Sequence, residues 1–169
     1  GKNGAGKTTL MNIITGTQGL DDGERWQLAG TVIGYLRQEI TPKPGQTVFD
    51  FVFEEMKPEE GQTPEMMLAL KSYKVDIVIR PLELSPDDRM DKLSGGQLRR
   101  AALARALVED PDILLMDEPF GALDEQTRSR LHDQLETIWS ETQKTILFVT
   151  HSISESIKLS DRIIVMGTK

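Results

Sequence analysis

The chain opens on a pattern of residues suited to binding phosphate. Gly1–Thr8 match the spacing G-x-x-x-x-G-K-[ST] at every fixed position. Glycines let a backbone curl until several N–H groups point inward at phosphate oxygens. The pattern also brings the Lys7 charge to the β- and γ-phosphates of a nucleotide and the Thr8 hydroxyl to a Mg²⁺ ion. The predicted phosphate ligands are Gly1, Asn3, Gly4, Ala5, Gly6, Lys7, Thr8 and Thr9.

A helix is expected directly after this loop, over residues 7–14, and its positive dipole end would face the same anion. A phosphate loop normally follows a buried strand. No residue precedes Gly1, and the chain does not begin with Met. We therefore expect a fragment of a larger protein, in which the first strand of the sheet is missing.

A second pattern favours another anion site in the middle of the chain. The run Leu93–Gln97 reads Leu-Ser-Gly-Gly-Gln and begins a predicted helix that ends near Glu109. Ser94 and Gln97 have the S-x-x-Q spacing of a capping box. The free backbone donors, the serine hydroxyl and the helix dipole of such a start attract anions. The candidate ligands are Ser94, Gly95, Gly96 and Gln97.

Short apolar runs predict the strands that must position these groups. Each run is continuous rather than alternating, as in parallel strands buried on both faces. A helix expected over 125–142 separates two of them, and strand, helix, strand in that order implies right-handed crossovers. The fold class is therefore α/β, a mostly parallel sheet flanked by helices. The expected strands are 31–36, 113–116, 146–149 and 163–166.

The stretch from about 41 to 110 differs from the rest in its prolines, charges and short amphipathic pieces. We interpret it as a helical subdomain inserted into an α/β core, within one domain spanning residues 1–169. Helices are expected at 48–56, 64–73 and 75–84, besides the one that begins after Leu93.

Composition narrows the classes of function. A net charge of −7 and a pI of about 4.9 argue against broad nucleic-acid binding, and no DNA partner is expected. The sequence has no cysteine, which excludes a disulfide framework and thiolate metal sites. The longest apolar runs are far shorter than the roughly 20 residues that span a bilayer.

Together these motifs resemble the nucleotide-binding domain of the ATP-binding cassette (ABC) superfamily of P-loop NTPases. The phosphate pattern comes first, Leu-Ser-Gly-Gly-Gln follows, and the 113–116 run then ends in Asp117 and Glu118. The 146–149 run is followed by Thr150 and a histidine, His151. The resemblance covers essentially the whole chain. It implies an ATPase that uses Mg²⁺, in which two cassettes pack head to tail and the Leu-Ser-Gly-Gly-Gln of one covers the ATP held by the other.

The resemblance also implies a role for each residue. Thr8, Gln38 and Asp117 would bind the Mg²⁺ ion directly or through water, since that ion prefers oxygen ligands. Glu118 would orient or deprotonate the attacking water, while His151 and Lys7 would contact the γ-phosphate. Gln38 would also approach the water. The catalytic set is Glu118, His151, Gln38 and Lys7.

The two halves of the chain resemble different branches of the superfamily. Residues 1–107 resemble the ABC-F ATPases, which are soluble, whereas residues from Met116 onward resemble the importer ATPases of the nitrate, sulfonate and taurine group. Three hypotheses remain. The first is an importer ATPase bound to a membrane permease at the inner face of the cell membrane. The second is an ABC-F ATPase acting on the ribosome, and the third is a truncated or chimeric remnant that binds nucleotide weakly. The segment Phe120–Asp124, which resembles the family's D-loop, and the segment 150–162 around His151 both resemble the importer ATPases. They favour the importer hypothesis.

Three further polar residues are expected to be uninvolved in catalysis. His132 lies within the 125–142 helix with no motif around it, and we expect it at the surface. Arg99 and Arg100 follow the Leu-Ser-Gly-Gly-Gln run, and we expect both to be solvent or interface charges.

Overall fold

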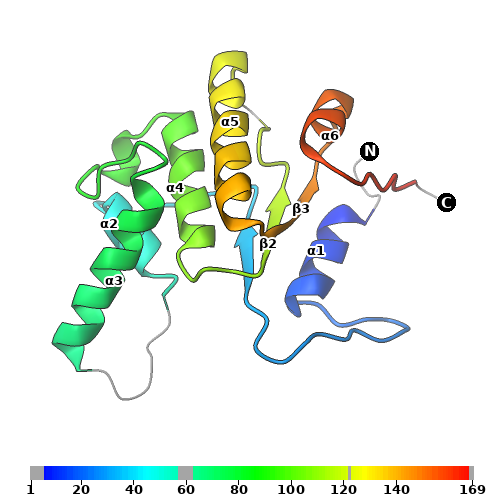
Figure 1. Cartoon of the computed structure of the whole chain (residues 1–169), viewed down its shortest axis with the longest axis horizontal. Coiled ribbons are helices and arrows are strands. Elements are labelled where there is room, and N and C mark those ends of the chain that lie inside the picture. The colour runs from blue at the N-terminus through cyan, green and yellow to red at the C-terminus, as the bar shows by residue number, and fades with distance from the viewer. Residues whose placement is uncertain (1–5, 57–62, 122, 168–169) are drawn as a thin grey trace.

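The computed structural model describes residues 6–56, 63–121 and 123–167 of the chain. Helices lie around a small sheet (Figure 1). In chain order the elements are α1 (Lys7–Thr15), β1 (Ile33–Leu36), α2 (Val48–Phe53), α3 (Pro64–Ile79), the 3₁₀ turn η1 (Met90–Lys92), α4 (Gly95–Leu107), β2 (Ile113–Asp117), α5 (Glu125–Thr142), β3 (Thr145–Val149) and α6 (Ile153–Leu159).

The sheet in the described part of the chain has three parallel strands in the order β1-β2-β3. Leu36 of β1 lies opposite Met116 of β2, and Asp117 of β2 lies opposite Val149 of β3. Parallel pairing brings the carboxyl ends of all three strands to one edge of the sheet. The predicted α/β class and the parallel sheet are confirmed.

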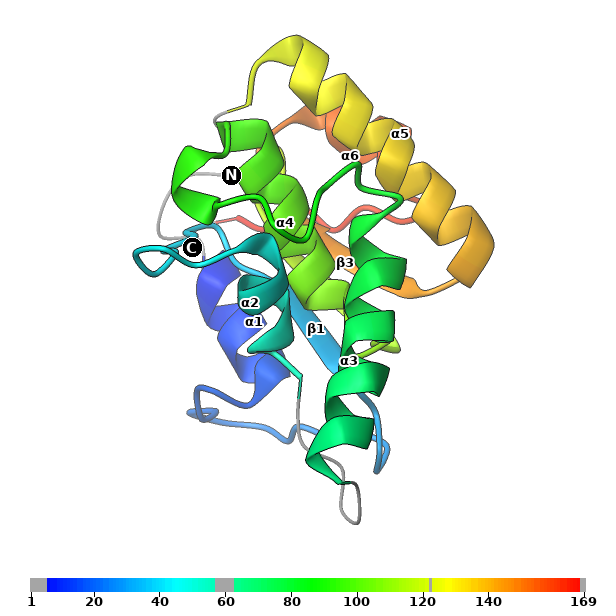
Figure 2. The ribbon, with the colours of Figure 1, turned by 90° about the vertical axis from the view of Figure 1, so that its left-hand side faces the viewer.

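Helices cover the sheet and one another. In Figure 1 the strands lie between α4 and α5 on one side and α1 on the other. Helix α4 packs on β1, and α2 and α3 contact α4 and each other, with α3 in front of α4 in Figure 2. Strand β1 approaches α4 so closely that a Cβ atom on Gly34 would lie 2.2 Å from the Ala106 carbonyl oxygen. Any side chain at position 34 would clash with α4, so this close contact requires glycine.

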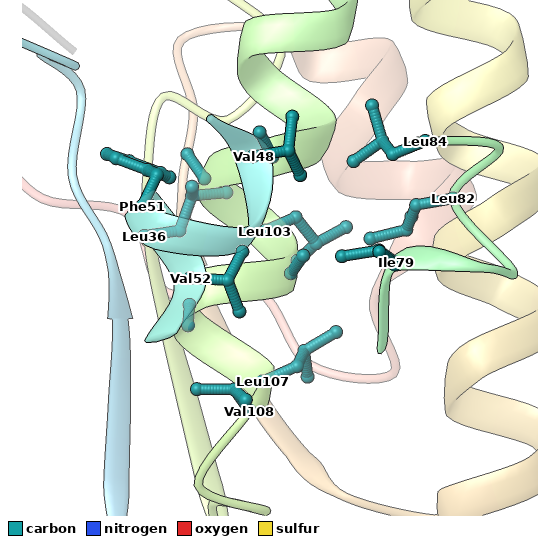
Figure 3. Close-up of a cluster of buried hydrophobic side chains, with 14 of the residues drawn as sticks. Leu36, Val48, Phe51, Val52, Ile79, Leu82, Leu84, Leu103, Leu107 and Val108 are labelled. Atoms are coloured by element: carbon teal, nitrogen blue, oxygen red, sulfur yellow. The ribbon is translucent and has the colours of Figure 1, made fainter. Parts of the chain in front are cut away.

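The main hydrophobic core lies between β1, β2 and these helices (Figure 3). Leu103 on α4 is 1% exposed and belongs to this cluster. Burial of such side chains is the dominant favourable contribution to folding. The residues labelled in the close-up are Leu36, Val48, Phe51, Val52, Ile79, Leu82, Leu84, Leu103, Leu107 and Val108.

The helix ends follow from local side chains. Thr47 and Asp50 form a capping box at the start of α2, and Thr63 accepts a hydrogen bond from the Met66 amide at the start of α3. Asp124 caps α5 by accepting from the Thr127 amide. Each cap satisfies backbone donors that the helix itself leaves free.

The structure differs from the sequence-based expectation in three elements. The pieces expected at 64–73 and 75–84 form one helix, α3, which ends at Ile79 and is followed by a turn. Helix α6 was not predicted, although Ser152 and Glu155 have the S-x-x-E spacing of a cap. The strand expected at 163–166 is wrong: this segment is irregular, and Val165 is 89% exposed. An apolar run needs a neighbouring strand for its backbone hydrogen bonds, and the described chain pairs none with it.

The expectation that His132 lies at the surface is also wrong. Its side chain on α5 is 7% exposed, and its ring meets the edge of Phe120 with 4.2 Å between the ring centroids. Within the described residues its Nε2 atom has no hydrogen-bond partner. Burial lowers the pKa of the His132 imidazole because the charged form loses water. Lys158 and Arg128 also lower it, whereas Glu155 and Glu136 act in the opposite direction.

We expect Leu103→Ala to lower the free energy of unfolding by about 2–5 kcal/mol, since the leucine is buried in the core and the change leaves a cavity. The matched control is Leu68→Ala on α3, where the leucine is 54% exposed and the expected change is within about 0.5 kcal/mol. Urea unfolding followed by circular dichroism measures both. Equal losses in the two variants would contradict the packing described here.

We also expect stability to fall as the pH drops below about 6.5 because of His132. Its folded-state pKa lies below the ordinary value of about 6.5, so the unfolded chain binds more protons in this pH range. The contribution of the neutral His132 imidazole to the free energy of unfolding is therefore fully present above pH 6.5 and is lost as the pH falls below that value. His132→Asn should flatten this slope, because it removes the group that takes up the proton. Denaturant titrations over this pH range would contradict the account if the variant kept the wild-type slope.

Candidate functional site

Strand β2 ends in two carboxylates at the edge where all three strands finish. Asp117 is 5% exposed. Glu118 follows it with a positive φ of 45°, which is uncommon for a residue other than glycine. The Glu118 amide donates to the Val149 carbonyl at 2.9 Å, and the Glu118 carbonyl accepts from the Gly121 amide at 3.0 Å. The chain therefore turns sharply at Glu118 and is held there from both sides.

Helix α1 brings two residues of the phosphate pattern to these carboxylates. The Thr8 Oγ1 atom donates a hydrogen bond to Asp117 Oδ2 at 3.3 Å. The Lys7 ammonium lies 3.7 Å from Glu118 Oε1. Gly6 precedes the helix with a φ of 78°, and Thr9 lies exposed on its first turn. The remaining predicted ligands, Gly1, Asn3, Gly4 and Ala5, lie outside the described residues.

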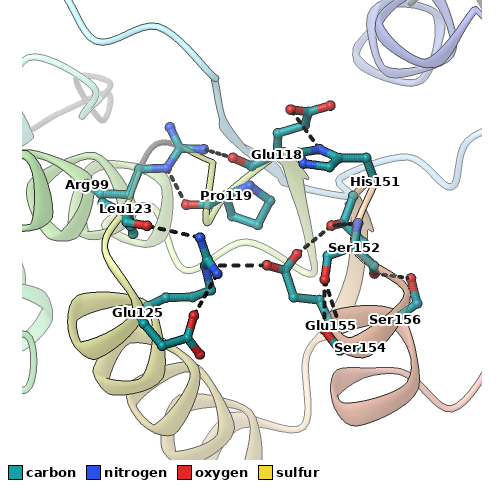
Figure 4. A network of polar contacts seen from close by, with 12 residues as sticks. Arg99, Glu118, Pro119, Leu123, Glu125, His151, Ser152, Ser154, Glu155 and Ser156 are labelled. Atoms are coloured by element: carbon teal, nitrogen blue, oxygen red, sulfur yellow. Dashed lines mark hydrogen bonds and ion pairs between the residues drawn. The ribbon is translucent and has the colours of Figure 1, made fainter. Parts of the chain in front are cut away.

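Strand β3 adds a histidine to the same cluster. His151 Nδ1 lies 3.3 Å from Glu118 Oε2, as Figure 4 shows. The Glu118 carboxylate thus lies between the Lys7 ammonium and the imidazole. We call the five side chains gathered here the carboxyl-edge cluster: Lys7, Thr8, Asp117, Glu118 and His151.

Gln38 lies at the same edge but is held differently. It follows β1, and its backbone carbonyl accepts a hydrogen bond from Arg99 Nη1 at 3.2 Å. Its side chain is exposed. The structure therefore brings the Gln38 backbone to this edge, without a side-chain contact to the carboxylates.

The Leu-Ser-Gly-Gly-Gln segment forms the start of α4. The predicted capping box is present, because Ser94 Oγ accepts from the Gln97 amide at 3.3 Å and Gln97 Oε1 accepts from the Ser94 amide at 3.0 Å. Ser94 and Gly95 are exposed, and Gly96 packs against Thr127 of α5. A hollow of about 180 Å³ opens beside this helix start. Among the described residues no hydrogen bond or ion pair joins Ser94–Gln97 to the carboxyl-edge cluster.

Arg99 contradicts its expected role as a solvent or interface charge. Its side chain is 5% exposed, and burial lowers its pKa to about 10 although the nearby Asp117 carboxylate raises it. The guanidinium donates to backbone carbonyls on both β1 and β2. The neighbouring Arg100 is only partly buried and pairs with Glu83 Oε2 at 2.9 Å. Charge type alone did not distinguish these two adjacent arginines.

Sequence reasoning also missed a buried carboxylate beside the cluster. Glu155 on α6 is 7% exposed, accepts a hydrogen bond from the Thr150 hydroxyl and lies 3.8 Å from Arg128 Nε (Figure 4). Ser152 Oγ accepts from the Glu155 amide, so the capping spacing at residues 152–155 was the signal that could have found it. Glu155 thereby fixes the turn that carries His151.

The oxygens of this cluster fit a magnesium nucleotide. Thr8 and Asp117 place a hydroxyl and a carboxylate oxygen 3.3 Å apart, and Mg²⁺ in phosphate sites is held by such groups together with phosphates and water. The described residues contain no group of three or more acidic or histidine side chains arranged to hold a metal ion alone. The donor set therefore suits an ion that arrives with a substrate. No helix of the described chain is long and apolar enough to cross a bilayer.

Comparison with known proteins agrees with this geometry. A family model described as "ABC transporter" matches residues 1–121. An uncharacterized ABC transporter ATP-binding protein of Methanocaldococcus jannaschii is 41% identical over 100% of this chain and 64% of its own length. The aliphatic sulfonates import ATP-binding protein SsuB of Bacillus cereus is 40% identical over 100% of this chain and 67% of its own length. The chain thus spans about two thirds of the length of these relatives.

Solved structures give the same family. A dimeric bacterial ABC transporter cassette is 28% identical with a TM-score of 0.73, covering 90% of this chain and 73% of that one. A post-hydrolysis state of an ATP-binding cassette with ADP and Pi is 26% identical with a TM-score of 0.66, again covering 90% and 73%. With its sequence motifs, its parallel sheet and these matches, the chain belongs to the ABC transporter family as an ATP-binding domain.

Proposed function

We propose that the protein hydrolyses ATP as the nucleotide-binding subunit of an ABC importer. The observation that carries this proposal is the position of Glu118, directly after the strand that ends in Asp117 and between Lys7 and His151. Phosphoryl transfer to water needs a positioned nucleophile and positive charge around the phosphoryl oxygens. The carboxyl-edge cluster holds side chains of both kinds.

The substrate would be bound as a magnesium complex. Thr8 and Asp117 would hold the Mg²⁺ ion, and the ion would supply positive charge beside the phosphate oxygens. Lys7 would contact the β- and γ-phosphates, together with the backbone of the phosphate loop from Gly1 to Gly6. In this arrangement the present Lys7–Glu118 contact, at 3.7 Å, would be exchanged for one with the phosphate.

Glu118 would then act on the attacking water. A carboxylate within hydrogen-bond reach of water can orient it or take its proton. His151, now 3.3 Å from Glu118, would contact the γ-phosphate, and the Gln38 side chain would turn toward the ion and the water. Each role requires the three strand ends to stay at one edge of the sheet.

A second copy of the domain would complete the site. Ser94 and Gly95 at the capped helix start are exposed, and among the described residues no hydrogen bond or ion pair joins this start to the carboxyl-edge cluster, as expected of a surface that contacts another molecule. In a head-to-tail dimer its free N–H groups would cover the γ-phosphate held by the partner copy. The dimeric cassette among the similar structures supports this assembly.

The importer assignment rests on relatives that align with both halves of the chain. The SsuB alignment covers 100% of the chain, so the front half, which resembles ABC-F ATPases, also aligns with an importer ATPase. The helical subdomain proposed for residues 41–110 would dock the permease, because α3 exposes the apolar side chains of Met66, Leu68 and Ile77. The protein would then lie at the inner face of the membrane, bound through that permease.

Glu118→Gln should lower ATP turnover by at least about 100-fold while leaving ATP binding intact, since it keeps the side-chain shape but removes the base. Phosphate release from purified full-length protein with Mg²⁺ and ATP measures turnover, and calorimetry measures binding. The control is Glu136→Gln, the same change on an exposed face of α5, where turnover should stay unchanged. Near wild-type turnover in Glu118→Gln would refute the assigned role.

The partner can be tested separately from the chemistry. The protein should sediment with membranes that contain the permease encoded beside it, and it should not sediment with ribosomes. Ribosome binding without membrane association would favour the ABC-F alternative and overturn the importer assignment.

A further inference from the structure

Arg99 joins three segments of the chain that are distant in sequence. It lies on the second turn of α4, and its guanidinium reaches the end of β1 and the end of β2 (Figure 4 shows its bonds to the β2 end). Nε donates to the Pro119 carbonyl at 2.7 Å. Nη2 donates to the carbonyls of Asp117 at 3.0 Å and Glu118 at 3.1 Å. Nη1 donates to the carbonyls of Arg37 at 2.6 Å and Gln38 at 3.2 Å.

These contacts use the full donor capacity of the side chain. An arginine has five N–H donors in a rigid planar fork, and each of them meets a carbonyl here. A lysine has three donors, and a glutamine has two. With the side chain 5% exposed, water has little access to replace a missing bond. A carbonyl left without its donor would therefore carry the cost of an unsatisfied buried polar group.

The carbonyls that Arg99 binds belong to the residues that form the site. Asp117 and Glu118 hold the carboxylates of the carboxyl-edge cluster, and Glu118 adopts a positive φ of 45°. A backbone in that region persists only where its surroundings hold it. On the other side, Arg99 donates to the backbone carbonyl of Gln38, whose side chain is exposed.

We propose that Arg99 is a positioning residue for ATP hydrolysis. It fixes the backbone of Glu118 and of Gln38 in position relative to helix α4. The inference rests on the proposed function, because it assigns Arg99 to that reaction. Arg99 does not contact the carboxylate of Glu118 itself. It acts through the main chain, and a shift of about 1 Å in a reacting group can cost on the order of 100-fold in rate.

The test compares arginine variants of the full-length protein under Mg²⁺ and ATP. Arg99→Gln should lower kcat by about 10- to 100-fold, while KM and the calorimetric affinity for ATP change by less than about threefold. Arg99→Lys, which keeps three donors, should recover part of the lost kcat. Arg105→Gln is the matched control on the same helix, where the arginine pairs with Glu55 on α2's flank, and it should keep wild-type kcat.

A double-mutant cycle with Glu118→Gln separates positioning from loss of fold. If Arg99 acts through Glu118, adding Arg99→Gln to the Glu118→Gln protein should lower turnover by less than about threefold more. A general destabilisation would instead lower turnover by the same factor in both backgrounds and reduce ATP binding as well.

The outcomes also separate this inference from the proposed function. Wild-type protein without ATPase activity would overturn both. Active wild type with an unchanged kcat in Arg99→Gln, or with fully additive losses in the cycle, would overturn only the role of Arg99. Should Arg99→Gln fail to fold, the same cycle with Arg99→Lys decides, since a kcat equal to wild type there would contradict the need for five donors.

Discussion

The central position of β2 is the constraint on which the site depends. It is paired on both sides by parallel strands, so its carboxyl end lies between those of β1 and β3. Asp117 and Glu118 therefore lie between the chain segment of Gln38 and that of His151. Parallel pairing alone brings the residues after each strand together at the carboxyl edge. Ligands in open α/β sheets bind at this edge for that reason.

Hydrogen bonds to main-chain groups then fix the backbone conformation after β2, which strand pairing does not determine. At the sharp turn, the Glu118 amide donates to the Val149 carbonyl, and the Glu118 carbonyl accepts from the Gly121 amide and from Arg99 Nη2. A buried guanidinium is costly unless its donors are matched, and here all of them meet carbonyls. The burial that lowers the pKa of Arg99 to about 10 still leaves it charged at neutral pH. The carboxyl-edge cluster is thus backed by a buried set of main-chain hydrogen bonds.

Much of the fold could be predicted from the sequence because local signals and tertiary contacts agree. The α5 bounds were predicted from the apolar residues on one face of the 125–142 stretch, and the capping box of Ser94 and Gln97 marked the start of α4. The continuous apolar runs predicted the three parallel strands within a few residues. The residues at their carboxyl ends, Asp117, Glu118 and His151, came together as the topology required.

The errors arose where a residue's environment depends on distant segments. The run at 163–166 has strand composition, but pairing is decided by a neighbour that the local sequence does not specify. His132 and Arg99 are polar residues on helices, and such residues usually face solvent. Their burial comes from Phe120 in one case and from five carbonyls in the other, and no periodicity predicts either.

The most direct test of the account is a crystal structure of the full-length protein with Mg²⁺ and a slowly hydrolysed ATP analogue. The account predicts that Lys7 leaves Glu118 for the γ-phosphate, that Asp117 and Thr8 face the ion, and that Ser94 of a second copy closes over the same phosphate. A nucleotide bound away from the carboxyl edge, or Glu118 remote from the γ-phosphate, would contradict it.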